Sequence, residues 1–472
     1  MRIRHHALLI AAAAVLCSGP PLRAAAMDAV LEHLDLSGYL QIRMWNVPSR
    51  TYVPGKFKSR HTYKNVNYFD LFFRNRFTIS ILPEIEIRSV FDVSAKFGKN
   101  DFSIDGGPAN LITRDVYAVF RPFKNSELSI GLEPFSLPGG YIIARDATGI
   151  HLSHFFEKSK VSISASYVKA YDDADDSFGQ GSDVPDFIWD DIVIFGTKFN
   201  ISSLIQCEAY YVYEDDRYTT NRLTFNTTNF TAGLTGDRKK GSLHWAGLHA
   251  MLLSGPWFLR AGGIVNAGVM FVRNEIYAFK KVRVLAGLFE FETGFSAGDL
   301  KISAIAEGAT GDPDRPYSGR SFQSIKGAHD FSYIVVDSTG GLSLRGSGES
   351  CWYGLYGCGV NLSCTFIDAV TLQVKLLHFG TMKTLYWRRK GTTWYGDEAD
   401  LGVEYRFRNT LNLFLNAGGF LPRRAYSAQM NMSNNRGYFS DIESRYVLRD
   451  LDNYSSKSMI FEVMLGVKVS YD

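Results

Sequence analysis

Basic side chains that suit anion binding occur in segments where polar and apolar residues alternate. Arg74 and Arg76 stand two residues apart, and Arg43 and Arg88 lie in the flanking segments. A guanidinium group matches a carboxylate through two parallel hydrogen bonds, so clustered arginines favour reversible contact with an anionic solute. The candidate solute-binding residues, assigned by parity to the polar faces of their segments, are Arg43, Arg74, Arg76, Arg88, Arg121, Lys375 and Arg406.

Acidic residues share these polar faces and allow two interpretations. They include Asp70, Glu86, Asp92, Glu398 and Asp400. Opposed basic and acidic walls would create a transverse field that orients a polar solute in a pore. In the other interpretation the charges pair across neighbouring strands and stiffen the wall. The sequence leaves both open.

Other chemistry is less well supported by the residue pattern. The His/Ser cluster at 151–154 places His151 and Ser153 on one face and His154 on the other, so no catalytic triad forms locally. One acidic run offers oxygen ligands for calcium but is more typical of a solvated loop: Asp172, Asp173, Asp175, Asp176 and Asp183. We therefore predict no enzyme activity, no metal site and no cofactor.

The alternation itself predicts long β-strands with one face in lipid. It runs through 34–44, 69–81 and 461–471, and charged residues occupy one face only. In a barrel wall a lipid-facing Arg or Lys at the bilayer midplane costs about 2–4 kcal/mol, which explains this segregation. A soluble sandwich would have shorter strands of about five or six residues. The predicted fold class is all-β, a transmembrane antiparallel β-barrel.

Turn-forming residues divide the chain into hairpins. Tight turns are expected at Pro83-Glu84, Lys124-Asn125, Lys158-Ser159, Ser202-Ser203, Gly255-Pro256, Ala297-Gly298, Ile367-Asp368 and Arg408-Asn409. Longer connections are expected near 46–65, 98–111, 134–149, 172–188, 216–241, 270–280, 311–350, 381–396 and 421–458. Outer-membrane barrels have short periplasmic turns and long extracellular loops, and these connections join about 18 strands.

The N-terminal segment has the features of an export signal. Arg2 and Arg4 precede an apolar stretch at 7–16, and Ala24-Ala25-Ala26 is a small-residue cleavage site. The expected division is a signal peptide at 1–26 and a barrel at 27–472. The predicted location is the outer membrane of a Gram-negative cell.

Composition and chain ends bear on partners. The net charge of +3 is too balanced to indicate nucleic-acid binding. Tyr471 ends the last alternating segment, as in chains handed to the outer-membrane assembly machinery. Cys207, Cys358 and Cys364 are expected as small wall residues, and a bridge between Cys351 and Cys358 stays open. The expected partners are outer-membrane lipid, the assembly machinery and a small polar or anionic solute.

Aromatic residues at strand ends suit the interfacial girdles of a membrane barrel, although a line of Tyr and Trp in the lumen could instead guide sugars. The candidates for the girdles are Trp45, Phe120, Phe156, Trp257, Trp387 and Trp394.

Two stretches resemble a known family. The sequence from Gly396-Asp397-Glu398-Ala399-Asp400-Leu401 to Tyr405, with Gly418-Gly419-Phe420-Leu421-Pro422, resembles the penultimate hairpin of the alginate export family of outer-membrane porins. Arg74-Asn75-Arg76-Phe77 and residues 149–169 look similar to early hairpins of that family. The resemblance implies an eighteen-stranded, monomeric channel for an anionic or otherwise polar solute.

Three functions are compatible with these features. The first is a porin for passive diffusion or export of small polar or anionic solutes, or of polysaccharide. The second is a barrel with a closed lumen whose surface loops act as an adhesin or receptor. The third is a component of polysaccharide export coupled to periplasmic proteins. Single-channel conductance separates the first two, because a closed barrel is electrically silent.

Overall fold

A computed structural model gives the arrangement of most of the chain. It describes residues 34–53, 60–97, 110–169, 190–220, 239–274, 277–311, 319–325, 331–335, 354–367, 369–387, 390–408, 410–425 and 459–471. In these ranges no helix combines the length and the apolar character that crossing a membrane requires.

The described chain is built from β-strands, in line with its period-two alternation. The strands are β1 (Leu34–Val53), β2 (Arg60–Leu82), β3 (Ile85–Phe97), β4 (Asn110–Phe120), β5 (Ser126–Ser136), β6 (Ala144–Phe156), β7 (Val161–Lys169), β8 (Asp190–Asn200), β9 (Ile205–Thr220), β10 (Lys239–Ser254), β11 (Trp257–Asn274), β12 (Tyr277–Ala297), β13 (Leu300–Ala309), β14 (Leu355–Phe366), β15 (Val370–Trp387), β16 (Lys390–Phe407), β17 (Leu411–Pro422) and β18 (Ile460–Tyr471). A short 3-10 turn, η1 (Pro138–Gly140), lies between β5 and β6.

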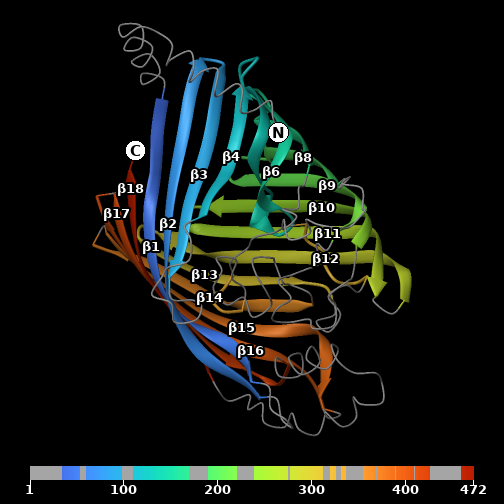
Figure 1. Cartoon of the computed structure of the whole chain (residues 1–472), viewed down its shortest axis with the longest axis vertical. Helices are drawn as coiled ribbons and strands as arrows, with labels where there is room; N and C mark the ends of the chain where they lie inside the picture. Colours follow the sequence, from blue (N-terminus) through green and yellow to red (C-terminus); the bar gives the residue numbers. More distant parts are fainter. Residues whose placement is uncertain are drawn as a thin grey trace.

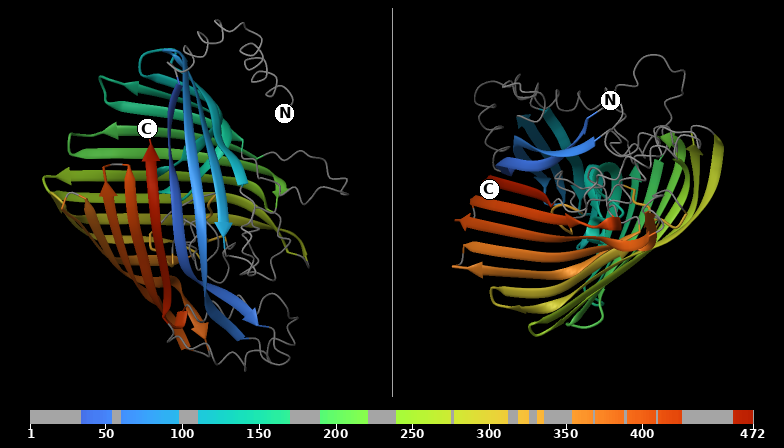
Figure 2. Two further views of the ribbon diagram at one scale, coloured as in Figure 1. Left: turned by 60° about the vertical axis from the view of Figure 1, so that its left-hand side comes forward. Right: turned by 90° about the horizontal axis from the view of Figure 1, so that it is seen from below.

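The strands form one closed barrel, which confirms the predicted fold class and strand count. Each strand pairs antiparallel with its neighbours in the sequence, and β1 pairs with β18 to close the sheet. Figures 1 and 2 show the strands following one another around the wall, with the C-terminal β18 beside β1. All pairings are therefore hairpins except the closing one.

The eight predicted tight turns lie where the sequence places them. Each one joins two consecutive strands, from β2–β3 to β16–β17. Several of these turns contain a residue in the left-handed region, such as Asn125 at φ 65° and Gly255 at φ 59°. The predicted long connection at 46–65 is wrong, because β1 and β2 pair through it from Asn46↔Asn67 to Val53↔Arg60. The predicted long connections at 270–280 and 381–396 are wrong, because β11–β12 and β15–β16 continue through them. Their pairing reaches Asn274↔Tyr277 and Trp387↔Lys390.

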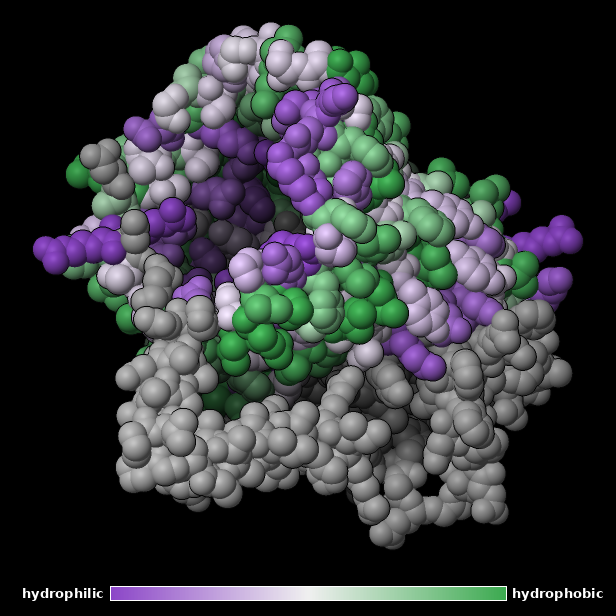
Figure 3. Space-filling view, turned by 90° about the horizontal axis from the view of Figure 1, so that it is seen from above, coloured by the Kyte–Doolittle hydropathy of each residue, from purple (hydrophilic) through white to green (hydrophobic). Residues whose placement is uncertain are grey.

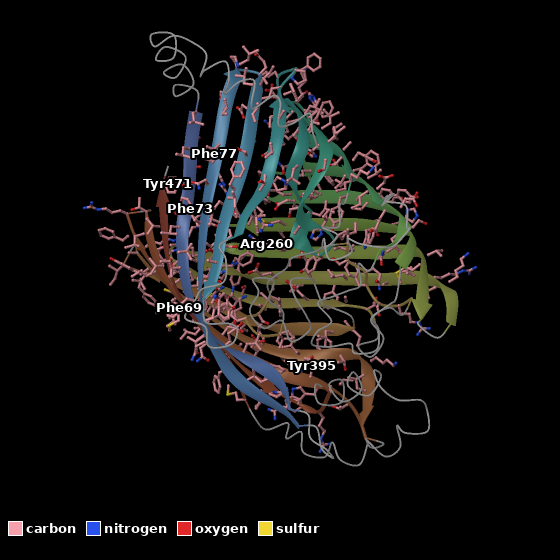
Figure 4. All side chains as sticks on the ribbon, viewed as in Figure 1. Phe69, Phe73, Phe77, Arg260, Tyr395 and Tyr471 are labelled. Atoms are coloured by element: carbon pink, nitrogen blue, oxygen red, sulfur yellow. The ribbon has the colours of Figure 1, made fainter. Side chains whose placement is uncertain are left out.

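The two faces of the wall have different chemistry. Large apolar side chains lie exposed on the outer face, including Phe69 at 50% and Leu376 at 54% exposure. On β2 the outer residues Phe69, Phe73 and Phe77 follow one another along the strand (Figure 4). Exposure of such side chains is favourable in lipid and unfavourable in water, so the outer face is suited to a membrane.

At the closing seam, where β1 pairs with β18, Gly38 and Tyr471 form an interlock of close contacts. Gly38 of β1 lies between Tyr471 of β18 and the backbone of β2, and a Cβ atom at Gly38 would lie 2.1 Å from the Arg74 carbonyl oxygen. The Tyr471 hydroxyl crosses this gap and donates to the side chain of Asn75. The aromatic ring of Tyr471 also lies 6.3 Å from that of Phe73. Residues from β18, β1 and β2 are thereby tied together.

Candidate solute passage

Three short segments extend inward and narrow the lumen. They are the 137–143 segment between β5 and β6 and the 321–325 and 331–335 segments between β13 and β14. The Ile325 amide donates to the Ile142 carbonyl oxygen at 3.0 Å, and Trp245 Nε1 of the wall donates to the Gln323 carbonyl oxygen at 2.8 Å. Ile142 and Trp245 are fully buried. The first two segments are therefore packed against each other, and Gln323 is bonded to the wall.

The 331–335 segment is held by an acidic pair on β16. The amides of Ile334 and Val335 donate to Glu398 at 2.7 and 3.1 Å, and the Tyr333 amide donates to Asp400 at 3.1 Å. A carboxylate that accepts backbone amides satisfies buried donors that would otherwise be unpaired. Glu398 and Asp400 thus position this segment.

Lys375 of β15 contacts the same segment. Its Nζ donates to the Phe331 carbonyl oxygen at 2.8 Å. The structure therefore gives this candidate solute-binding residue a positioning contact. The predicted solute contact stays a prediction.

The 137–143 segment is anchored to β12 and β13 through Tyr141. Burial and the neighbouring carboxyl groups of Glu307 and Glu290, to which its hydroxyl is hydrogen-bonded, raise the pKa of Tyr141 well above its usual range. His249 Nδ1 lies 2.5 Å from Glu290 Oε1, and the Tyr210 hydroxyl lies 3.1 Å from His249 Nε2. The inner segment is thus tied to the wall by a chain of polar contacts.

The predicted basic wall exists, and most of its arginines are ion-paired. Arg43 binds Asp70 through two bonds of 2.8 and 2.7 Å. Arg74 binds Asp92 through two bonds of 2.7 Å. In both pairs the fork of the guanidinium is occupied by a carboxylate of the next strand.

Glu86 joins the next two candidates. Arg88 Nη2 donates to it at 2.7 Å and Arg121 Nη1 at 2.6 Å. Arg406 Nε lies 2.5 Å from Glu404 on the far side of the seam. The Arg121–Glu86 contact links β3 to the residue that follows β4, as in the interpretation in which charges pair across strands, whereas Arg88 and Arg406 pair along their own strands.

Arg76 differs from the other candidates. It is exposed, and among the residues that the structure describes no carboxylate lies within ion-pair distance of it. By strand parity it is on the same face of β2 as Arg74, toward the tight-turn end. Arg76 is therefore the guanidinium of this wall that is best placed for a passing anion.

Arg114 belongs to the basic wall and was missed from the sequence. It donates to Asp92 at 2.8 Å and lies 3.1 Å from Asp146. Parity counted from the neighbouring Asp115 assigns Arg114 to the outer face. A register shift between Val90 and Phe91 changes that parity, and a bulge of this kind has no clear signal in the sequence.

Two cavities lie between the inner segments and the wall. The turn-side cavity, about 490 Å3, is lined by residues of β1 and β14–β18 together with Tyr333. The central cavity, about 440 Å3, is lined by Gly139 and Phe331 of the inner segments and by six charged side chains: Arg260, Glu290, Glu292, Lys301, Glu307 and Lys375. Figure 3 shows the barrel hollowed at one end, with hydrophilic residues lining the hollow.

The aromatic predictions divide. Phe156, Trp257 and Trp394 are exposed at 44%, 61% and 45%, as a girdle requires. Trp45 is not a girdle residue, because it is 2% exposed, stacks on Tyr68 and donates to Asp70. Phe120 is half-buried, and the Trp387 side chain lies outside the described residues.

The histidines of the 151–154 cluster contact serine hydroxyls. His151 Nδ1 lies 2.8 Å from Ser166 Oγ, and His154 Nδ1 lies 2.7 Å from Ser126 Oγ. Within the described ranges neither histidine is hydrogen-bonded to a carboxylate, and no cluster of metal-ligating side chains occurs. Cys207, Cys358 and Cys364 carry free thiols, whereas Cys351 and the acidic run at 172–183 lie outside the described residues.

The fold matches solved outer-membrane porins. No protein-family model and no curated protein matches the sequence. A BenF-like porin from Pseudomonas fluorescens Pf-5 is 11% identical, with a TM-score of 0.52 over 93% of this chain and 99% of that one. OpdQ from Pseudomonas aeruginosa is 13% identical, with a TM-score of 0.51 over 93% and 97%. OccK5 (OpdH) from the same organism is 12% identical, with a TM-score of 0.50 over 93% and 99%.

These matches define the class of fold, an eighteen-stranded barrel of the porin type. They agree with the barrel that the family resemblance implied. The narrower resemblance to the alginate export family gains no support from them.

Proposed function

We propose that the chain is an outer-membrane porin through which small polar or anionic solutes diffuse along their concentration gradients. The observation that carries this proposal is the pair of cavities, both lined in part by polar and charged side chains, between the inner segments and the wall of a closed eighteen-stranded barrel. A barrel of this strand number is wide enough for an aqueous lumen, and inward segments reduce it to the size of small solutes. The porin titles of the structural matches agree with it.

The location in the outer membrane rests on the chemistry of the wall. Apolar side chains cover the outer face, and every described strand has neighbours on both sides, so the wall has no open edge in lipid. Cleavage after residue 26, a monomeric state and delivery by the assembly machinery stay predictions. No cofactor is needed, because the gradient drives the flux.

The ion pairs set the expected selectivity. Arg43 and Arg74 pair with Asp70 and Asp92. Arg88 and Arg121 share Glu86, and Arg121 also lies 3.4 Å from Glu127, so these arginines contribute little net field. Arg76 adds an unmatched positive charge on one wall. We therefore expect a weak anion preference.

A closed lumen is the competing function, in which long connections act as an adhesin or receptor surface. The burial of Tyr141, Ile142 and Ile334 inside the barrel favours it over a wide-open pore. Planar-bilayer recording of the refolded protein separates the two. Stable conductance steps, with a reversal potential under a salt gradient of the sign expected for anion selectivity, support the porin. Absence of conductance from protein shown to be folded refutes it.

A further inference from the structure

The turn-side cavity has a composition that differs from the rest of the lumen. Its neutral polar lining consists of side-chain amides and hydroxyls: Gln41, Ser363, Thr371, Gln373, Asn412 and Asn416. Amides offer donors and acceptors at once, whereas carboxylates accept only and guanidinium groups donate only. A ligand with hydroxyl groups, which also donate and accept, can be satisfied by such a lining at several positions.

The charges of this cavity cancel. Two basic side chains, Arg43 and Lys468, and two acidic ones, Glu404 and Glu462, line it. Arg43 is held by Asp70 in a bidentate pair, and Glu404 accepts from Asn412 at 2.8 Å as well as from its neighbour Arg406. A charged ligand would therefore gain little electrostatic binding energy in this cavity, because the lining charges sum to zero.

Aromatic rings supply apolar surface beside these polar groups. Phe414 and Tyr333 are half-buried at the cavity. Ligand pockets commonly combine such rings with a few polar groups that fix orientation, and their volumes are about 300–1,000 Å3. The cavity of about 490 Å3 falls in this range.

Tyr333 lines the turn-side cavity, and its ring centroid lies 5.9 Å from Nζ of Lys375, a residue that lines the central cavity. Its hydroxyl donates to Asn416 Oδ1 at 3.4 Å, and a Cβ atom at Gly402 would lie 2.8 Å from that hydroxyl. The absence of a side chain at Gly402 therefore leaves the space in which the phenol lies against β16. Gln373 lines both cavities, so a solute that passes Tyr333 stays in contact with the same amide.

We propose that the turn-side cavity is a binding subsite for a neutral, polyhydroxylated solute of the size of a small sugar, with Tyr333 as the residue that determines passage between the two cavities. This inference rests on the proposed porin function. It assigns the half of the passage near the tight turns to hydrogen bonding, and it assigns charge selection to the central cavity and to Arg76.

The test is block of ionic current in planar bilayers by glucose and by glucuronate, which differ in one carboxylate. With the full-length protein, we expect glucose to reduce the current in a saturable way and glucuronate to have no greater affinity. Asn416→Ala and Gln373→Ala each remove hydrogen-bonding groups. Each is expected to weaken the block by glucose about two- to tenfold.

Tyr333→Ala is expected to raise the conductance without sugar and to weaken the block, while Tyr333→Phe keeps the ring and the partition. Gln206→Ala is the matched control, because Gln206 is an exposed amide on the lumen face of β9, outside the cavity. If the channel conducts but Asn416→Ala, Gln373→Ala and Tyr333→Ala leave the glucose block unchanged, the subsite is refuted and the porin function is not. Block by glucuronate alone refutes the neutral ligand. The absence of any conductance refutes the porin and the subsite together.

Discussion

Arg74 and Arg76 lie on the same face of one strand, and the structure predicts opposite consequences when each is replaced by glutamine. Arg74 is paired to Asp92, whose side chain is 1% exposed, whereas Arg76 is exposed and has no carboxylate partner among the described residues. Arg76→Gln should therefore change ion selectivity with little change in stability. Arg74→Gln should change stability.

The size of each effect follows from these contacts. A unit charge at about 5 Å from a passing ion in water contributes about 0.8 kcal/mol, or about fourfold in local ion concentration, and screening at 0.1 M salt reduces this to about twofold. Because the charge attracts the anion and repels the cation by the same factor, loss of Arg76 should lower the ratio of anion to cation permeability about four- to sixteenfold. Replacing Arg74 removes two charge-assisted hydrogen bonds to Asp92, while Arg114 still donates to Asp92 at 2.8 Å. We therefore expect the free energy of unfolding to fall by about 2–3 kcal/mol.

The assay combines reversal potentials across a salt gradient with denaturant unfolding in detergent. Arg76→Gln should shift the reversal potential toward zero, more strongly at low salt, and leave the unfolding midpoint within error of wild type. The reasoning is refuted if Arg74→Gln alters selectivity more than Arg76→Gln does. It is also refuted if the unfolding midpoint falls for Arg76→Gln and not for Arg74→Gln.

Substitutions at the seam and at the inner segments test how the narrowed barrel is held. Gly38→Ala places a methyl group against the β2 backbone and should cost about 1–3 kcal/mol, seen as a lower temperature of heat modification on gels; an unchanged temperature would contradict the interlock with Tyr471. Trp245→Phe removes the indole N–H that donates to the Gln323 carbonyl oxygen, which should weaken the attachment of this inner segment by about 1–3 kcal/mol. Openings of larger conductance should then become more frequent, and an unaltered opening pattern would contradict this. Because the folded-state pKa of Tyr141 lies above its usual value of about 10, its contribution is complete below that pH and is lost as the pH rises toward the raised value. Wild-type current should thus become noisier only above about pH 10, and Tyr141→Phe should be noisy at neutral pH; identical traces would exclude this anchoring role.

Strand positions were predictable because the lipid imposes a local rule. Most lipid-facing positions are apolar, so Phe69, Leu71 and Phe73 indicate both the strand and its orientation. Turn chemistry, as at Gly255-Pro256, then fixes where each hairpin reverses. The connections at 270–280 and 381–396 were mispredicted because a strand that extends beyond the membrane no longer needs an apolar face.

The passage was less predictable because it depends on contacts between distant parts of the chain. The sequence could not indicate that 137–143 and 331–335 extend inward, since the amides that bond Glu398 and Asp400 belong to every residue type. Trp45 was predicted as a girdle residue because aromatic residues at strand ends usually lie in the girdles. Its hydrogen bond to Asp70 instead places it on the lumen face. For Arg43 the contact with Asp70 agrees with the face that parity assigned, whereas a bulge misled parity at Arg114.

The closing seam also bears on how the barrel is made. Gly38 and Tyr471 are partners in the β1–β18 register, and the chain between them spans nearly the whole molecule. Closing a flexible loop of that length costs about 5 kcal/mol of chain entropy, whereas a hairpin such as β10–β11 closes over two residues. Closure must therefore follow most of the hairpin pairings, which shorten the path between the two ends. We expect this closing step to set the assembly rate, so substitutions at Gly38 should slow assembly more than equally destabilising substitutions within any hairpin.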